Sequence, residues 1–218
     1  MSARTASVDP GQIPEPNVTR FLFADTRLAP VWLVIRVYLG VLWFVAGWEK
    51  IFDPAWTGEA AGAAVTGYSQ GAIQQTAGEN PQVTGWYASF LENFVIPNAV
   101  PFSYVVAYGE LLVGLGLIVG LFTGIAAFFG GFMNASFLFA GTAGANPLMF
   151  ILATWLVLGW RVAGHWGLDR WALRLVGVPG APGELFRGRR RGRSGDNEAD
   201  ESERRERSGA GRRTDGRD

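Results

Sequence analysis

The chain has 218 residues, of which 49% are hydrophobic, and it contains 9 Trp, 15 Phe and no Cys. Without cysteine, the chain cannot itself supply disulfides, thiol redox chemistry, covalent haem attachment or iron–sulfur ligands, and the single histidine, His165, cannot form a bis-histidine haem site. The net charge of +0 averages an apolar body and a polar C-terminal part, a composition typical of an integral membrane protein with a soluble tail.

The first predicted element is an apolar helix over residues 29–52. It is long enough to cross a bilayer, since about 20 residues rising about 1.5 Å each span a hydrocarbon core of about 30 Å. At helical spacing its polar and small residues share one stripe, while Val, Leu and Phe face lipid. The stripe consists of Arg36, Gly40, Trp43, Gly47 and Lys50. A charge in a membrane span costs at least about 2.5–3.5 kcal/mol, which makes Arg36 a candidate functional residue.

Residues 53–101 form the next segment, which we expect to lie outside the cell. After Asn80 and Pro81, which suit a helix start, apolar residues recur at helical spacing. They are Val83, Trp86, Tyr87, Phe90, Leu91 and Phe94. This pattern predicts an amphipathic helix whose apolar residues share a face covered by the bundle or the bilayer. Residues 57–77 are more weakly helical, and the segment fits a structural cover, a substrate lid or a partner-docking surface.

Three further membrane-spanning helices are predicted, over residues 102–120, 124–141 and 147–163. The first two are separated by so few residues that they must form a tight antiparallel hairpin, in which Gly120 ends one helix and Thr123 caps the next. The predicted fold is therefore an all-α integral membrane protein, with a four-transmembrane-helix bundle over residues 29–163.

The distribution of basic residues predicts the topology. Arg4, Arg20 and Arg27 precede the first span and many arginines follow the fourth, whereas residues 53–101 contain no Lys or Arg. By the positive-inside rule, both termini of this multi-pass plasma-membrane protein are cytoplasmic. Residues 1–28 lack the layout of a cleavable signal and form a cytoplasmic N-terminal segment.

After the fourth span, apolar residues opposite arginines predict an interfacial helix over residues 164–178. Residues 179–218 alternate Arg with acidic and small residues, and too few of them are apolar to form a core, so this tail is predicted to be disordered. Its arginines could hold the anionic inner leaflet. Without interleaved aromatic residues, nucleic-acid binding is not expected.

The chemistry is expected at the polar residues inside the spans. The ligand- or quinone-binding candidates are Arg36, Trp43, Lys50, Glu110 and Asn134. Helix rise and side-chain direction favour an ion pair between Lys50 and Glu110, with Arg36 left for a third partner or a ligand. A small error in the helix boundaries would instead favour Arg36. The pair is either a structural contact that fixes helix register or part of a ligand site.

Several of these residues carry a resemblance to a known family. The motifs are an Arg in the first span, G-x6-G-x2-K from Gly40 to Lys50, and GE-x3-G-x2-L-x2-G from Gly109 to Gly120. Together with a closing G-x-x-G-L-D at Gly164–Asp169, they resemble the DoxX/DoxD family over residues 27–172. Gly124 and Gly167 depart from that pattern, since members often have Arg and Ser there.

The resemblance implies a four-helix membrane subunit associated with redox chemistry, of the thiosulfate:quinone oxidoreductase type or a membrane partner in a redox complex. No motif in the chain fits a flavin, a covalent cofactor or a metal, so a quinone is the electron carrier that fits. Trp43 or Trp48 would position it, and Arg36, Glu110 or Lys50 would form hydrogen bonds to it. A non-enzymatic scaffold or a carrier for a lipid-like molecule is the alternative. Besides the bilayer, a redox partner subunit and a second copy of the chain are candidate partners, and no residue is assigned as catalytic.

Overall fold

The computed structural model describes the backbone of residues 16–176 and the side chains as far as Ala172. The described residues are helical and include no strand, which confirms the all-α prediction for this part of the chain. The chain divides into two compact units between Arg170 and Trp171, within helix α10 (Asp169–Val176). The remaining helices are α1 (Asn17–Ala24), η1 (Thr26–Leu28), α2 (Ala29–Phe52), α3 (Pro54–Thr57), α4 (Ala63–Gln74), α5 (Gly85–Phe90), η2 (Leu91–Val95), η3 (Ile96–Asn98), α6 (Ala99–Val119), α7 (Thr123–Phe139), α8 (Asn146–Leu158) and α9 (Trp160–Ala163).

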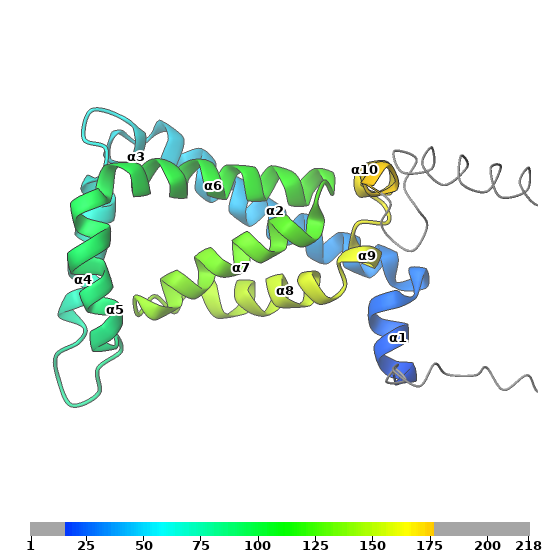
Figure 1. Cartoon of the computed structure of the whole chain (residues 1–218), viewed down its shortest axis with the longest axis horizontal. Helices are drawn as coiled ribbons and strands as arrows, with labels where there is room; N and C mark the ends of the chain where they lie inside the picture. Colours follow the sequence, from blue (N-terminus) through cyan, green and yellow to red (C-terminus); the bar gives the residue numbers. More distant parts are fainter. Residues whose placement is uncertain (1–15, 177–218) are drawn as a thin grey trace, which may run out of the picture. The chain divides into compact units, whose positions relative to one another are not determined.

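Four apolar helices dominate the first unit (Figure 1). By length and composition, α2 and α6 are able to cross a membrane, whereas α7 and α8 are shorter apolar helices. Helix α2 begins and ends at the predicted residues. At about 1.5 Å per residue, its 24 residues extend about 36 Å, and the 17 residues of α7 about 26 Å.

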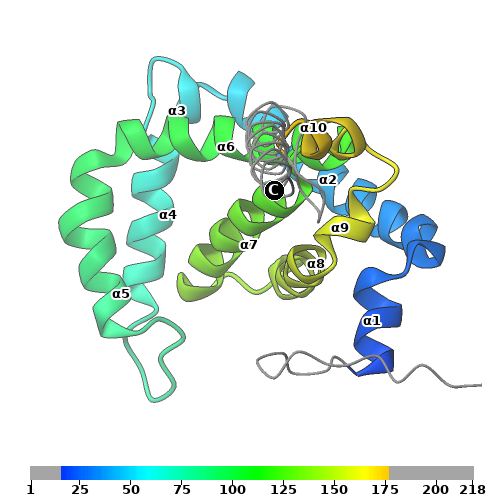
Figure 2. The same ribbon diagram turned by 45° about the vertical axis from the view of Figure 1, so that its right-hand side comes forward.

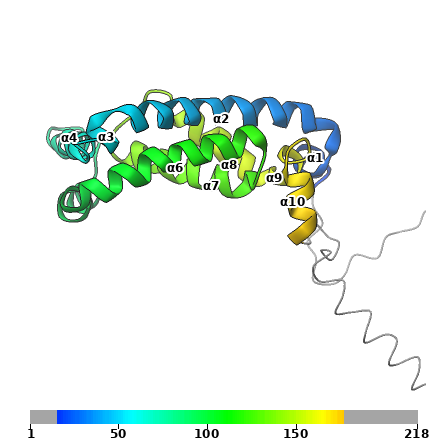
Figure 3. The same ribbon diagram turned by 90° about the horizontal axis from the view of Figure 1, so that it is seen from above.

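Helices α2 and α6 lie side by side with their backbones in close contact (Figure 3). A Cβ atom at Gly47 would overlap the backbone of Leu111, and one at Gly114 would overlap the backbone of Phe44. Glycine is therefore needed at both positions for the helices to approach this closely. Such contacts between small residues hold helices together where lipid removes the hydrophobic driving force.

Buried apolar side chains form two clusters. One lies within the bundle and includes Trp32, Leu39, Trp43, Val113, Leu117, Ala127, Ala153 and Leu156. The other lies beneath the helices of the segment 53–101 and includes Val65, Ala72, Val83, Tyr87, Leu91, Val95 and Ala140. Large apolar residues also cover the outward faces of the bundle, as expected for surfaces that meet lipid.

The prediction of a continuous helix for the fourth span is wrong. Helix α8 ends at Leu158 and the short helix α9 begins at Trp160, so the chain breaks at Gly159. A Cβ at Gly159 would lie 3.0 Å from ring atoms of Trp32. The indole of Trp32 thus packs against the break, and a Cβ at this position would require the ring to shift by a few tenths of an ångström.

The predicted hairpin between the second and third spans is present. Gly120 ends α6 with a left-handed backbone, φ 68°, as expected of a glycine at the C′ position of a helix. Helix α6 starts earlier than predicted, at Ala99, and α7 starts at Thr123. The predicted capping role of the Thr123 side chain is wrong, since its Oγ1 atom is buried and forms no hydrogen bond with the described residues.

The connecting segment 53–101 lies across one end of α2 and α6, with α4 and α5 side by side (Figures 1 and 2). The predicted helix start at Asn80 is wrong, because α5 begins at Gly85 and is followed by the π-helical turn η2. The bundle covers only part of the predicted apolar face. Tyr87 and Leu91 are buried against the bundle, whereas Trp86 is 62% exposed. The apolar residues therefore form two neighbouring faces, one covered by the bundle and one exposed.

At the N-terminal side, the structure adds a helix that was not predicted. The indole Nε1 of Trp32 donates a hydrogen bond to the carbonyl oxygen of Leu22 at the end of α1, 2.9 Å away, and its ring packs on Phe23. Helix α10 falls within the predicted interfacial helix. The predicted disorder of residues 179–218 lies outside the described residues.

Candidate functional site

Lys50 and Glu110 form an ion pair between α2 and α6. The Lys50 Nζ and Glu110 Oε2 atoms are 2.7 Å apart, and the two side chains are 21% and 2% exposed. The Lys50 ammonium also lies over the ring of Trp56, 5.1 Å from its centroid. This is the predicted pairing, and the alternative pairing of Glu110 with Arg36 is not formed.

The close approach of α2 and α6 explains why these two charges meet. Gly47 packs directly on the α6 backbone at Ala107 and Leu111. Lys50 lies about one helical turn beyond Gly47, and Glu110 immediately precedes Leu111. The glycine contact therefore sets the register that brings the ammonium to the carboxylate.

Trp43 of α2 and Asn134 of α7 are buried polar side chains within the bundle. The Nε1 atom of Trp43 and both amide atoms of Asn134 lack a hydrogen-bond partner within residues 16–176, and Asn134 is 0% exposed. A Cβ at Gly130 would lie 3.0 Å from the Trp43 Nε1, which places the indole against α7. Because Asn134 follows Gly130 by one turn on the same face of α7, its amide also points into the bundle.

An unpaired buried polar group costs about 1–3 kcal/mol. Within a bilayer no water is available to replace the missing hydrogen bond. The three unpartnered atoms of Trp43 and Asn134 supply three N–H groups, one on the indole and two on the amide, and one acceptor oxygen. Lys50 supplies a cationic donor in the same bundle. Such a set suits a small molecule that carries carbonyl or hydroxyl oxygens.

Arg36 lies apart from these residues, at the other end of the bundle. It is about 21 Å from Lys50 along the α2 axis, and the fully buried apolar residues Leu39 and Leu117 separate the two ends. The structure therefore pairs Lys50 with Glu110, and it places Asn134 on α7 next to Met133, which faces Gly109. Trp43 lies midway along α2, about 10 Å from Arg36 and from Lys50. We call these two regions the Lys50 end and the Arg36 end of the bundle.

The guanidinium of Arg36 is enclosed by backbone. Arg36 is 1% exposed, and its Nη2 donates to the carbonyl oxygen of Trp166 at 3.5 Å. A Cβ at Gly120 or Gly167 would overlap the guanidinium, so glycine at both positions makes room for it. Asp169 is the acid that attracts it electrostatically, although the two do not form an ion pair.

Asp169 is a residue whose role sequence reasoning missed. Its buried carboxylate accepts hydrogen bonds from the backbone N–H groups of Phe122, 2.5 Å, and Thr123, 2.9 Å, at the start of α7. Its own N–H donates to the carbonyl oxygen of Gly120 at 2.7 Å. The acid thus caps α7 in place of Thr123. The Gly164–Asp169 motif was the available signal, but nothing in it indicates which helix the acid caps.

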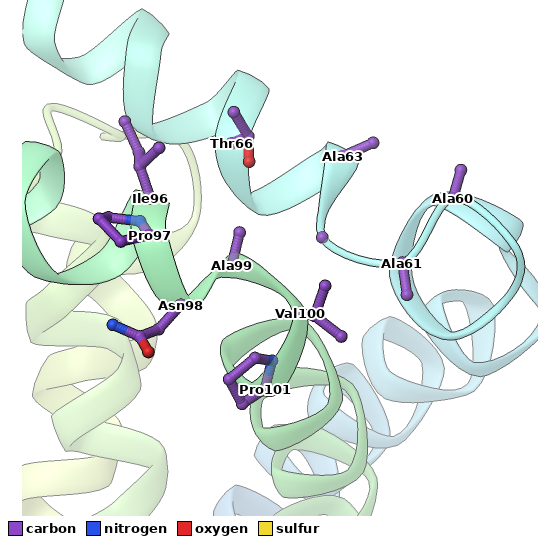
Figure 4. A pocket seen from close by; sticks show the side chains of 11 residues that line it. Ala60, Ala61, Ala63, Thr66, Ile96, Pro97, Asn98, Ala99, Val100 and Pro101 are labelled. Atoms are coloured by element: carbon purple, nitrogen blue, oxygen red, sulfur yellow. The ribbon is translucent and has the colours of Figure 1, made fainter.

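A shallow groove of about 380 Å³ lies at the base of the connecting segment (Figure 4). It is formed by residues 60–63 and 96–101 together with Thr66, and its walls are mainly Ala, Pro and backbone. None of the candidate site residues lines it. The part of the chain that the structure describes also contains no group of three or more His, Cys, Asp or Glu residues placed to hold a metal.

Apolar helices with buried charges between them define the class of this protein as a helical membrane protein. The family model described as DoxX matches residues 31–143, which is more than half of the 218-residue chain, and the chain belongs to the DoxX family. No curated protein and no solved structure matches the chain. The matched range includes all five candidate site residues, and it ends before Asp169.

Proposed function

We propose that the chain is a quinone-linked membrane subunit of a redox system that binds a quinone at the Lys50 end of the bundle. The observation that carries this proposal is the Asn134 amide, which is fully buried with both polar atoms unpartnered among the described residues. Trp43 and Asn134 would donate hydrogen bonds to the quinone oxygens, and the ring would lie among the apolar residues of α2, α6 and α7.

The Lys50–Glu110 pair suits the proton chemistry of a quinone. Reduction to the quinol takes up two electrons and two protons. The pair would supply one proton inside the bundle, and water reached through Lys50 would supply the second. Lys50 is partly exposed, so it connects Glu110 to water at that end of the bundle. The electrons come from a donor outside this chain, either thiosulfate, as in DoxD-type enzymes, or a partner subunit.

Quinone retention tests this proposal. Protein purified without added quinone is extracted with organic solvent, and the extract is analysed by mass spectrometry. We expect the parent chain to retain quinone and Asn134→Leu to lose it while keeping its thermal stability. The matched control is Thr154→Val, which changes an exposed polar residue of α8 that bonds only its own helix. A parent chain without quinone, or an Asn134→Leu variant that keeps it, contradicts the proposal.

A non-enzymatic carrier or scaffold for a lipid-like molecule is the second candidate function. The same unpartnered polar groups favour it, because they would bind any amphiphile with suitable oxygens. The two functions differ in electron transfer. Reduction of the bound quinone after addition of thiosulfate supports the enzymatic function. Retention of another lipid, with no quinone in the extract, supports the carrier function.

The proposal includes a plasma-membrane topology with both termini in the cytoplasm, supported by the absence of Lys and Arg from residues 53–101. Because the chain has no cysteine, single-cysteine variants report on topology without background. Gln70→Cys, at an exposed position of α4, should react with an impermeant thiol reagent in intact cells, and Ser208→Cys only after permeabilisation. Equal labelling of both in intact cells contradicts the topology.

A further inference from the structure

The helical stretch formed by α5 and η2 has three distinct faces. One face is buried against the bundle and contains Tyr87, Ala88, Leu91 and Val95. A second face, exposed and polar, contains Ser89, Glu92 and Asn93. Between them lies a third face, here called the aromatic face, which contains Trp86, Phe90 and Phe94 and is exposed by 62%, 39% and 53% respectively.

The aromatic face is continuous with the two neighbouring apolar helices. Trp86 contacts Phe139 at the end of α7, with ring centroids 5.6 Å apart. Phe90 stacks on Phe94, and Phe94 contacts Phe102 in the first turn of α6 at 5.8 Å. The aromatic rings thus connect the adjacent ends of α7 and α6.

Below this connection, the outward faces of both helices stay apolar. Val105 and Leu112 of α6 and Phe132 of α7 are each more than 60% exposed. In a membrane protein, such surfaces are covered by lipid tails. The aromatic face therefore extends the lipid-covered surface and is not an isolated patch surrounded by polar residues.

From this continuity we infer that α5 and η2 lie in the membrane interface. Trp86, Phe90 and Phe94 insert at the boundary between headgroups and acyl chains, and Ser89, Glu92 and Asn93 face water. Large aromatic rings favour this depth, and a helix with adjacent apolar and polar faces lies parallel to the membrane plane. The orientation of α5 agrees with this placement, since in Figure 1 α5 crosses the end of α6 instead of continuing it.

Contacts to α7 hold this interfacial helix to the bundle. The hydroxyl of Tyr87 donates a hydrogen bond to the carbonyl oxygen of Ser136, 2.8 Å away. Because α7 ends close by, at Phe139, the insertion depth of the aromatic face also sets the height of the bundle in the bilayer. This inference concerns the lipid contact alone and does not depend on the proposed quinone site.

Site-directed spin labelling tests the inference. Phe90→Cys and the matched control Glu92→Cys, on the polar face of the same stretch, each carry a nitroxide in vesicles of phosphatidylglycerol and phosphatidylethanolamine. Collision with apolar O2 and with a water-soluble nickel chelate is then measured by power saturation. A label on Phe132→Cys, on the exposed face of α7, marks the lipid-facing reference.

We expect the label at position 90 to collide several-fold more with O2 than with nickel, as at position 132, and the label at 92 to show the reverse preference. Nickel access at 90 equal to that at 92 places the aromatic face in water and overturns the inference. Low access of both reagents at 90 indicates cover by a protein or a second copy and also overturns it. Phe94→Cys, at a more exposed position, gives a second reading if the label at 90 disturbs the fold.

Discussion

The two ends of the bundle hold buried charge in different ways. At the Lys50 end, a cation and an anion meet directly at 2.7 Å, and the neighbouring helix α7 holds the buried, unpartnered amide of Asn134. At the Arg36 end, the buried cation and acid do not pair. Arg36 is enclosed by glycines and a carbonyl group, and Asp169 binds backbone N–H groups at the start of α7.

This difference separates two uses of a buried charge. Asp169 joins the turn after α6, the start of α7 and the chain segment after α9, so its role is to close the bundle. The Lys50 end differs in that its two charges neutralise each other directly. Among the described residues, buried polar atoms without partners occur at both ends, namely Arg36 Nε and Nη1 and Thr123 Oγ1 at one and the Asn134 amide at the other. The contacts of Asp169 give the Arg36 end a role in closing the bundle, whereas ligand binding at the Lys50 end is the role that we propose.

The largest effect is expected from Asp169→Ala. The change removes both hydrogen bonds to the start of α7 and leaves Arg36 without its neighbouring acid. Two buried hydrogen bonds to a carboxylate contribute about 3–5 kcal/mol together, and losing them corresponds to a fall in Tm of about 10 °C for a chain of this size. Thermal unfolding in detergent, followed by circular dichroism, measures the loss.

The matched control is Asp25→Ala, since Asp25 also accepts a backbone N–H at a helix start but does so on the exposed surface. We expect no measurable change in Tm for this variant. Equal losses for the two variants would mean that burial does not distinguish these caps, and the assignment of closure to Asp169 would fail.

The next largest effect is expected from Glu110→Gln, which leaves Lys50 without its counter-ion. The loss should be about 3 kcal/mol, at the low end for a broken buried pair because Lys50 reaches water. The double variant with Lys50→Met should recover most of that stability, since no charge is left unpaired.

Quinone retention in the same double variant separates a site from a structural pair. If the pair only fixes helix register, the double variant keeps both stability and quinone. We expect it to keep stability and lose quinone, because the cationic donor Lys50 and the exchangeable proton of the pair are gone. Full retention of quinone would remove the Lys50–Glu110 pair from the proposed site.

The sequence predicts the local features of this fold well. Helix α2 follows from an uninterrupted apolar run, the end of α6 follows from Gly120, and the Lys50–Glu110 pair follows from helix rise and side-chain direction. Each of these depends on residues within one helix or on two neighbouring antiparallel helices. In such cases the spacing of residues along the sequence is sufficient to predict the structure.

The features that the sequence does not predict depend on distant contacts. The break at Gly159 involves the Trp32 indole, and the cap of α7 comes from Asp169, far along the chain. The faces of α5 also depend on which side meets α7, because helical spacing groups Trp86 with Tyr87 although only Tyr87 is buried. Helical periodicity in the sequence identifies an apolar face, but it does not show whether protein or lipid covers that face.

A smaller effect is expected from Gly130→Ala, which sharpens the assignment of ligand binding to Trp43. The added Cβ would lie 3.0 Å from the Trp43 Nε1 and should displace the indole, at a cost of about 1–3 kcal/mol for overpacking. Quinone retention should fall by more than the stability loss explains. Gly131→Ala is the control, because its Cβ would lie at an ordinary 3.4 Å from Ala153. Equal quinone retention in the two variants would exclude a role for Trp43.

The smallest effect concerns the hydrogen bond that ties α5 to the Lys50 end. Burial raises the pKa of Tyr87 to about 12, and burial also raises the pKa of Tyr68, which shares a hydrogen bond with Thr142. The raised pKa means that the folded state favours the neutral phenol. The stability from Tyr87 is therefore fully present below about pH 10, the unfolded value, and is lost as the pH rises to about 12.

Tyr87→Phe should cost about 1 kcal/mol at neutral pH, the net value of one neutral hydrogen bond, and should flatten the fall in Tm between pH 10 and pH 12. Part of the fall should persist, because Tyr68 still contributes. Tyr108→Phe, on the exposed face of α6, is the control and should follow the parent profile. Alkaline loss should therefore begin at the Lys50 end, where Tyr87 holds α5 to α7. Proteolysis after α4 that increases with pH in the parent but not in Tyr87→Phe would locate the loss there, and a parent Tm that stays constant across this range would contradict it.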